Sequence, residues 1–326
     1  MIFSVDVGYR QVKAIQQKAK IIFPSSVAHA KSFAIESLGK INDYAVNIET
    51  KDGQVKEYFV GNLAEREAAG SLITQNDRVK HMDPSHKVLI LTAGRLLMSE
   101  AEASNTLVVG LPISYYKSQK DELEDNMRSI DARVSVDQAP AQNLKFDHVH
   151  VFPQGSGALM TVDDLTKNGT VCLVDIGMKT TDCVVARIGN GHMTPIASMC
   201  TSVELGVKDF YDTIGKFYQN KTGSASNFVR TLEIVERKGQ VTFNRQPLDM
   251  SREIEAARDE IQQAILDRVK NSLADVWAEL DEIYTAGGGA SVFDTISERM
   301  GATMVQDPVW ANARGFLKVG QSKAAI

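Results

Sequence analysis

Long apolar segments are absent from this sequence. No run of apolar residues approaches the roughly 18 that a membrane-spanning helix needs. The chain opens directly on a β-like segment, which leaves no room for a secretory signal peptide. We therefore expect a cytoplasmic protein that does not interact with a membrane.

Cysteine and net positive charge are also scarce. The three cysteines, Cys172, Cys183 and Cys200, lie in apolar runs without metal-ligand spacing, so we expect buried free thiols. The 36 Lys and Arg residues are outnumbered by 41 Asp and Glu, for a formal net charge of -5. This balance argues against a generally basic face that binds nucleic acid directly, although a local patch stays open.

The most informative pattern surrounds Asp175. The apolar run 171–174 ends on this aspartate, Gly177 follows, and Thr180 and Thr181 lead into a second β-rich run, which predicts a hairpin with a polar tip. Such a tip can bind phosphate, because glycine admits an anion close to backbone N–H groups and the hydroxyls add donors. A carboxylate beside it suits Mg²⁺ held through water. From this stretch alone, an ordinary hairpin remains the alternative.

The same pattern occurs at the N-terminus, about half the chain earlier. An apolar run there ends on an aspartate, and a glycine again follows two residues later. The matched pairs are Asp6 with Asp175, Gly8 with Gly177, Tyr9 with Met178 and Arg10 with Lys179. Each hairpin is followed by a segment marked by a proline, Pro24 or Pro195, which predicts a third strand. The repeat indicates two domains built on one duplicated plan.

The paired hairpins resemble the phosphate motifs of the actin, Hsp70 and sugar-kinase ATPase superfamily. Residues 151–158 resemble its first connecting helix, residues 284–291 its adenosine-binding glycine turn, and residues 310–316 its second connecting helix. The short chain, the 111–116 segment and Glu204-Leu-Gly206-Val207 make it most similar to the ParM/StbA-type actin-like proteins, especially their archaeal-like branch.

This resemblance implies an α/β actin-like ATPase fold, with two duplicated ribonuclease-H-like domains around a nucleotide cleft. At 326 residues, 43% of them hydrophobic, the chain can bury two cores. We expect a first domain over 1–153 with an insertion at about 29–80. The second is expected over 154–326 with an insertion at about 222–250, and its C-terminal helix, at about 310–320, packs back on the first domain.

The resemblance also implies roles for four residues. Asp6 and Asp175 would hold Mg²⁺ through water, Lys13 would contact the phosphates, and Gln154 would orient the attacking water. Phosphoryl transfer depends on positioning and charge neutralisation, which these groups can supply. Because an amide is a weak base, hydrolysis would be slow. The alternatives are a solvated lysine at position 13 and a turn amide at position 154.

The remaining candidate residues lie in turns and glycine segments. Tyr9 departs from the family pattern, since Ser or Thr is common there, and Met178-Lys179 replaces a common second glycine. Glu204 and Lys208 are candidates to reach the ribose or base, while the glycine run could equally be a tight strand-to-helix turn. The set comprises Gly8, Tyr9, Arg10, Gly177, Met178, Lys179, Thr180, Thr181, Glu204, Gly206, Lys208, Gly287, Gly288, Gly289 and Ala290.

We interpret the chain as a nucleotide-dependent, filament-forming ATPase that segregates plasmid or similar DNA. Its cofactors would be Mg²⁺ and ATP, with GTP as the alternative, and its partners would be further copies in a polar filament and a DNA-bound adaptor protein. Head-to-tail contacts that do not close generate such filaments. The alternatives are a small-molecule kinase acting on a sugar or acid, and a nucleotide-binding scaffold with negligible turnover.

Several local signals complete the prediction. Asp52-Gly53 predicts a hairpin turn, Asp83-Pro84 and Ser251 predict helix starts, and a helix is expected over 118–130. Another helix should open the second half and run to about Lys167. Contacts of opposite charge between subunits could join two sets of residues. The basic set is Arg230, Arg237, Lys238 and Arg245, and the acidic set is Glu65 and Glu67.

Overall fold

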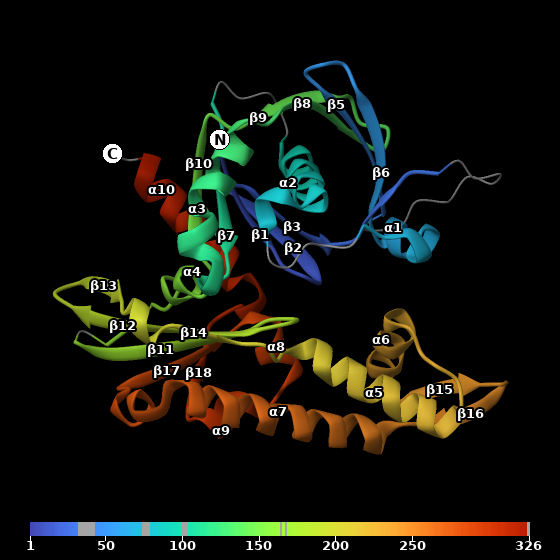
Figure 1. The fold of residues 1–326 in the computed structure, drawn as a ribbon, viewed down its shortest axis with the longest axis vertical. Coiled ribbons are helices and arrows are strands. Elements are labelled where there is room, and N and C mark those ends of the chain that lie inside the picture. The colour runs from blue at the N-terminus through green and yellow to red at the C-terminus, as the bar shows by residue number, and fades with distance from the viewer. Residues whose placement is uncertain (32–42, 74–78, 99–103, 164, 167, 325–326) are drawn as a thin grey trace. The chain divides into compact units, whose positions relative to one another are not determined.

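The computed structural model describes residues 1–31, 43–73, 79–98, 104–163, 165–166 and 168–324 (Figure 1). The chain divides into two compact units. Unit 1 comprises Met1–Asp163 and Trp310–Ile326, and unit 2 comprises Asp164–Val309. The predicted insertion at about 29–80 is described in part, because residues 32–42 and 74–78 lie outside the described ranges. The predicted domain limits at 153 and 154 remain predictions.

A five-stranded sheet forms the base of unit 1. Its strands are β1 (Ile2–Val7), β2 (Gln11–Gln16), β3 (Ala19–Pro24), β7 (Thr106–Leu111) and β10 (His148–Pro153). The order is β10-β7-β1-β2-β3. The strands β1, β2 and β3 are mutually antiparallel neighbours, whereas β7 and β10 continue the sheet as parallel strands. The predicted first hairpin and its third strand are confirmed.

A second five-stranded sheet belongs to the same unit. Its strands are β4 (Val27–His29), β5 (Asp43–Thr50), β6 (Val55–Gly61), β8 (Asp131–Val136) and β9 (Gln142–Lys145), in the order β4-β6-β5-β8-β9. Helix α1 (Asn62–Glu67) follows β6. The predicted turn between β5 and β6 is confirmed, and Gly53 has a φ of 80°, a left-handed conformation that favours glycine.

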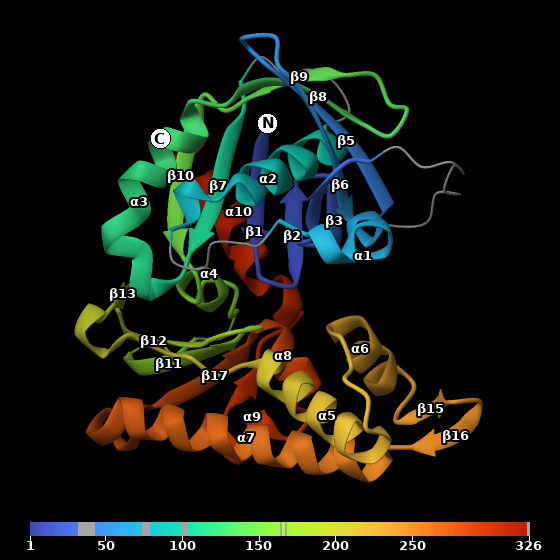
Figure 2. The same cartoon turned by 45° about the vertical axis from the view of Figure 1, so that its right-hand side comes forward.

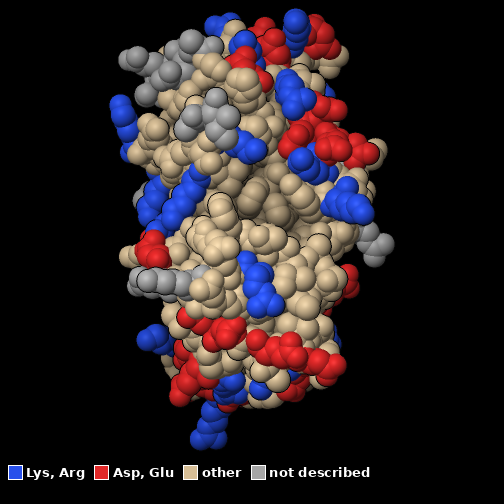
Figure 3. Space-filling view, turned by 90° about the vertical axis from the view of Figure 1, so that its left-hand side faces the viewer, with Lys and Arg blue, Asp and Glu red and all other residues tan. Residues whose placement is uncertain are grey.

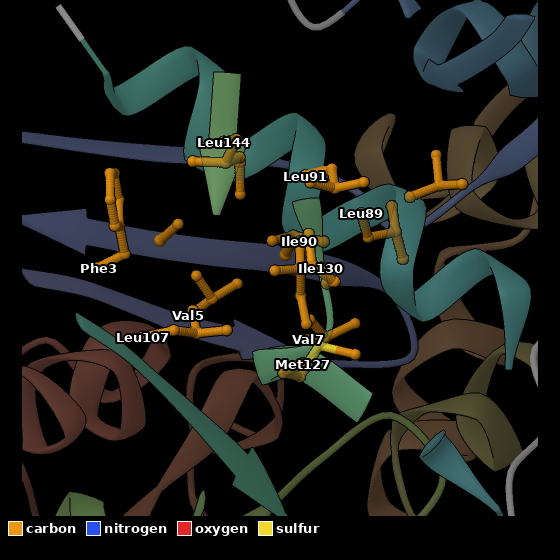
Figure 4. Packing of buried hydrophobic residues seen from close by; sticks show 14 of the residues in the cluster. Phe3, Val5, Val7, Leu89, Ile90, Leu91, Leu107, Met127, Ile130 and Leu144 are labelled. Carbon is orange, nitrogen blue, oxygen red and sulfur yellow. The ribbon is translucent and has the colours of Figure 1, made fainter. Parts of the chain in front are cut away.

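Helix α2 (Pro84–Leu97) contacts strands of both sheets. Its predicted start is confirmed, because the Asp83 carboxylate accepts a hydrogen bond from the backbone N–H of Ser85. Figure 4 shows how its side chains meet those of β1 and of α3 (Ile113–Arg128) in one core. The fully buried side chains labelled there include Phe3, Val5, Leu89, Ile90, Leu91 and Leu107. Helix α3 begins five residues before the predicted Ser118.

The other face of the first sheet is covered by α10 (Ala311–Ala324), which also contacts the short α4 (Ser156–Leu159). Side chains alternate along β7, so Val109 joins the main core while Val108 packs against Phe316 and Val319 of α10. Helices α4 and α10 meet at two glycines. A Cβ on Gly315 would lie 1.9 Å from the carbonyl oxygen of Gly157.

Unit 2 repeats the strand plan of the first sheet. Its strands are β11 (Gly169–Ile176), β12 (Thr181–Gly189), β13 (His192–Pro195), β14 (Thr201–Val203), β17 (Glu282–Ala286) and β18 (Thr303–Met304). The order β13-β12-β11-β17-β18 corresponds to β3-β2-β1-β7-β10, with the same parallel and antiparallel neighbours, and β14 also pairs with β12. The duplication predicted from the sequence is therefore confirmed.

The helices of unit 2 are α5 (Val207–Thr222), α6 (Phe228–Glu236), α7 (Ser251–Leu273), α8 (Gly287–Val292) and α9 (Ile296–Met300). Of these helices, α7, α8 and α9 contact this sheet, α5 packs on α7, and α6 packs on α5 (Figure 2). Helix α6 and the hairpin of β15 (Gln240–Phe243) and β16 (Gln246–Asp249) occupy the predicted insertion at 222–250. One face of α7 is buried, including Ile254, Ile261 and Val269.

Two expected absences concern membranes and disulfides. Within the described ranges, no helix is both long and apolar enough to cross a lipid bilayer. All three cysteines are free thiols: Cys172 and Cys183 are buried, and Cys200 is half-buried.

Candidate functional site

The tips of the two duplicated hairpins have the same backbone geometry. In β1–β2 the N–H of Gly8 donates to the carbonyl of Gln11 at 3.1 Å, and in β11–β12 the N–H of Gly177 donates to the carbonyl of Thr180 at 2.8 Å. A Cβ on either glycine would lie at 3.1 or 3.0 Å from that same carbonyl oxygen. The tight turn thus explains why glycine occurs at both positions.

In unit 1 the structure brings together three of the predicted site residues. Asp6 is 5% exposed at the end of β1, and the Nζ atom of its cross-strand neighbour Lys13 lies 3.5 Å from its Oδ2 atom. The Nε2 atom of Gln154 donates to the Oδ1 atom of Asp6 at 2.9 Å. Lys13 also lies over the turn, since its Nζ atom is 3.3 Å from a Cβ built on Gly8. A cation, a carboxylate and an amide therefore converge beside this turn.

The next two residues of the turn contact other parts of unit 1. The Nη1 atom of Arg10 lies 2.5 Å from the Oε1 atom of Glu65, which also accepts a hydrogen bond from Ser26. The ring of Tyr9 lies 4.4 Å from the Nζ atom of Lys80 in a cation–π contact. Arg10 is thus engaged by a carboxylate in this structure, and a phosphate would have to compete with Glu65.

In unit 2 two carboxylates lie side by side across the hairpin. Asp175 and Asp182 are cross-strand partners, 7% and 5% exposed. Burial raises the pKa of Asp182, while hydrogen bonds from the Ser202 and Thr180 hydroxyls act in the opposite direction. The Oδ1 atom of Asp182 is buried, and it has no hydrogen-bond partner among the described residues. A cation bound nearby would offset the cost of burying the Asp182 carboxylate.

The two threonine hydroxyls that were predicted as phosphate donors form hydrogen bonds with other groups of unit 2. Thr180 donates to the Oδ2 atom of Asp182 at 3.1 Å, and the fully buried Thr181 donates to the carbonyl of Leu205 at 2.8 Å. Both hydroxyls are thus engaged by partners within unit 2.

Helix α5 begins directly on the tip of the second hairpin. The N–H of Val207 donates to Gly177 at 3.1 Å, and the N–H of Lys208 donates to Met178 at 2.8 Å. A Cβ on Gly206 would lie 2.7 Å from the Gly177 carbonyl oxygen, so only glycine permits this approach. The exposed side chain of Lys208 forms an ion pair with Asp212 in the next turn. Glu204 is also exposed.

The glycine run packs against the same aspartate. Strand β17 lies beside β11, and the two strands pair Ala286 with Asp175. Gly287 has a φ of 84°, and a Cβ there would lie 2.3 Å from the Oδ1 atom of Asp175. On Gly289 a Cβ would lie 2.2 Å from Ile176, whereas on Gly288 it would meet nothing within 4 Å. The run is thus a tight strand-to-helix turn, and it also places its backbone at the carboxylate.

Asp182 was not among the residues predicted from the sequence. It follows Thr181 directly and occupies the position that Lys13 holds in the first hairpin. The sequence repeat already aligns Asp182 with Lys13. The two residues differ in charge, so the alignment did not mark Asp182 as a site residue.

The donor set suits a hydrated magnesium ion. No cluster of three or more His, Cys, Asp and Glu side chains with the geometry of a metal site occurs within the described residues. Magnesium retains much of its water shell and needs only one or two carboxylates. Asp6 in unit 1, and Asp175 with Asp182 in unit 2, each provide that chemistry within their own unit.

Comparison with known families covers most of the chain. The profile described as Actin like proteins N terminal domain matches residues 4–157. The profile described as Archaeal actin homologue MreB-like, C-terminal, matches residues 173–298. No curated protein matches the chain in sequence.

Solved structures agree over nearly the full length. A 15-stranded ParM filament from Clostridium botulinum is 28% identical, with a TM-score of 0.86 and coverage of 98% of this chain and 99% of that chain. The pCBH ParM non-polymerisable quadruple mutant has the same identity and coverage and a TM-score of 0.85. The archaeal actin homolog Ta0583 in complex with ADP shares the fold, with 19% identity, a TM-score of 0.78 and coverage of 98% and 99%.

The family profiles match both halves of the chain, and the duplicated sheets carry the same glycine-turned hairpin. This chain therefore belongs to the actin-like proteins and has their two-domain α/β fold.

Proposed function

We propose that this chain is a Mg²⁺-dependent ATPase that assembles into polar filaments in the cytoplasm and segregates plasmid or similar DNA. The observation that carries the proposal is the duplicated hairpin tip, with Lys13 and Gln154 gathered on Asp6 in one unit and Asp182 beside Asp175 in the other. Similar solved structures include a ParM filament, which supports assembly, and an archaeal homolog in complex with ADP, which supports nucleotide binding.

Each group has a task in the proposed hydrolysis. When bound, magnesium neutralises phosphate charge. Asp6 and Asp175 would hold its water shell, and Lys13 would add a second positive charge beside the turn of Gly8. The Gln154 amide orients the attacking water, with its Nε2 atom donating to Asp6 and its Oε1 atom accepting from that water. Positioning of this kind supplies most of the rate in phosphoryl transfer.

The nucleoside would contact unit 2 near the glycine run. Gly287 and Gly289 bring backbone close to the nucleotide, and Glu204 and Lys208 at the start of α5 reach the ribose or base. ATP is the proposed nucleotide, and GTP is the alternative. Of the turn residues, Arg10 binds phosphate only when it leaves Glu65.

The charges expected to join subunits are largely paired within each chain. Arg230 and Arg237 both contact Glu233, at 2.6 and 3.2 Å. Glu65 binds Arg10, and Glu67 binds Arg66 at 2.7 Å. Exposed Lys238 and Arg245 are the better candidates for basic contacts.

DNA would be reached through an adaptor protein. On the face drawn in Figure 3, Lys and Arg are interspersed with Asp and Glu, so that face presents no continuous basic surface for a nucleic acid.

Assembly and turnover can be measured together. Light scattering and pelleting of the pure protein with Mg²⁺ and ATP, GTP, ADP or no nucleotide should give assembly above a critical concentration, followed by a decline as nucleotide is consumed. Asp6→Ala should weaken binding of the magnesium nucleotide, and Asp175→Ala should nearly abolish hydrolysis while nucleotide still binds. Asp125→Ala, at an exposed position on α3, is the matched control and should behave as the wild type.

Two outcomes would contradict the proposal. Undiminished turnover in Asp175→Ala would remove the site assignment. Unchanged scattering up to tens of micromolar (about the range over which weak self-association shows), combined with turnover stimulated by a sugar or acid, would favour a small-molecule kinase.

A further inference from the structure

The backbone around Gln154 is held from both sides. Gln154 follows β10, and its own N–H donates to the carbonyl of Leu111, at the end of β7, at 2.8 Å. The next N–H, that of Gly155, donates to the Oδ1 atom of Asn312 at 2.8 Å, across a separation of 157 residues in the chain. The backbone at residues 154 and 155 is thus held by β7 on one side and by α10 on the other.

Asn312 is itself held in place. Its side chain is buried, at 8% exposure, in the first turn of α10. The Ser4 hydroxyl on β1 donates to the carbonyl of Ala313, the next residue. The contact of Gly315 with Gly157 leaves no room for α10 to approach α4 more closely. The Asn312 carboxamide is therefore a fixed acceptor rather than a mobile surface group.

Gly155 needs such an acceptor. Its φ of 77° lies in the left-handed region, and its N–H is directed into unit 1, where a donor left unpaired would be destabilising. Without the Asn312 oxygen, the turn would be free to rotate this N–H toward another partner. Rotation at Gly155 would carry Gln154 with it.

We propose that Asn312 is a positioning residue for Gln154. By fixing the Gly155 N–H, it holds the Gln154 amide where Nε2 reaches Asp6. In the proposed hydrolysis, Oε1 would then accept a hydrogen bond from the attacking water. Asn312 acts on hydrolysis through this turn. The inference rests on the proposed function, in which Gln154 orients the attacking water.

The first test needs no nucleotide. Hydrogen exchange of the Gly155 amide should be about tenfold faster or more in Asn312→Ala than in the wild type, because the acceptor is gone. Asn312→Asp retains an oxygen at this position and should restore slow exchange. Asn105→Ala removes another buried amide of unit 1, which contacts the Lys145 carbonyl, and should leave Gly155 unchanged. Unchanged exchange in Asn312→Ala would overturn the proposal.

The second test is a double-mutant cycle on turnover. Asn312→Ala should lower kcat by about tenfold to a hundredfold, since a displacement of about 1 Å costs on that order, with little change in KM. In the Gln154→Ala background the same substitution should have almost no further effect, because its only route is already lost. If the two substitutions lowered kcat by factors that multiply in the double variant, the proposal would be overturned, since Asn312 would then have a general structural role.

The two tests separate this inference from the proposed function. If the wild type shows no turnover, the proposed function fails and the role of Asn312 in hydrolysis fails with it, whatever the exchange experiment shows. If the wild type turns over and either test gives the contrary result, the inference alone fails. Should Asn312→Ala not fold, Asn312→Ser, whose hydroxyl is too short to reach Gly155 in the same way, replaces it in both tests.

Discussion

His86 is held neutral in the first turn of α2. Burial lowers its pKa to about 3, and the positive charge of Lys80 acts in the same direction. In the unfolded chain the imidazole of His86 has a pKa near 6.5, so it takes up a proton there more readily than in the folded protein. The contribution of neutral His86 to stability is therefore complete above pH 6.5 and is lost as the pH falls. Between pH 6.5 and about 3, we expect this group to lower the free energy of unfolding by about 1.4 kcal/mol per pH unit.

Urea titrations across this pH range check the prediction. His86→Leu should show a shallower dependence on pH than the wild type, because it has no group to protonate. His148→Gln removes an exposed histidine at the start of β10 and should keep the wild-type slope. Equal slopes for His86→Leu and the wild type would show that His86 does not control acid stability.

At the scale of elements, the glycine turn between β17 and α8 offers a matched pair. Gly287→Ala introduces a methyl group at a φ of 84° and 2.3 Å from the Asp175 carboxylate, so it should lower the free energy of unfolding by about 2 kcal/mol or more. Gly288→Ala places its methyl group in open space and should leave stability unchanged or slightly higher. Thermal unfolding of both variants compares them, and equal melting temperatures would refute the assigned geometry.

The elements that could be predicted are those with local signals. The two hairpins follow from apolar runs ending on Asp6 and Asp175, and the start of α2 follows from Asp83-Pro84, because capping and turn chemistry act over a few residues. The prediction that a helix runs to about Lys167 was wrong. Helix α4 ends at Leu159, where it is packed against α10 at a glycine contact that local sequence does not reveal.

The same distinction applies to the candidate site. The repeat pointed to Asp6, and the family resemblance pointed to Lys13 and Gln154. The structure brings these three side chains together. The pairing of Arg10 with Glu65 joins residues 55 positions apart, so no local pattern could predict it. The Asn312 contact spans a still larger separation.

At the scale of the whole molecule, unit 1 is discontinuous and unit 2 is continuous in sequence. A fragment of residues 164–309 should therefore fold alone. A fragment of residues 1–163 should not, because Val108 and Phe152 lose the cover of Phe316, and each large buried apolar side chain contributes about 1.5–3 kcal/mol. Joining 1–163 to 310–326 through a flexible linker should restore folding.

Circular dichroism and cooperative thermal melting distinguish these fragments. A cooperatively folded 1–163 fragment without the C-terminal segment would contradict the importance assigned to α10. A 164–309 fragment that fails to fold would show that unit 2 depends on unit 1.

The position of α10 also has a consequence for synthesis on the ribosome. Protein domains generally begin to fold as they emerge from the exit tunnel. The residues of unit 2 are all available before α10 is made, so the later half of the chain can finish folding first. The sheet that carries Asp6 stays uncovered on one face until residues 311–324 emerge. A nascent chain thus lacks the Asn312 acceptor, which delays a fully ordered Gln154 until translation has passed α10.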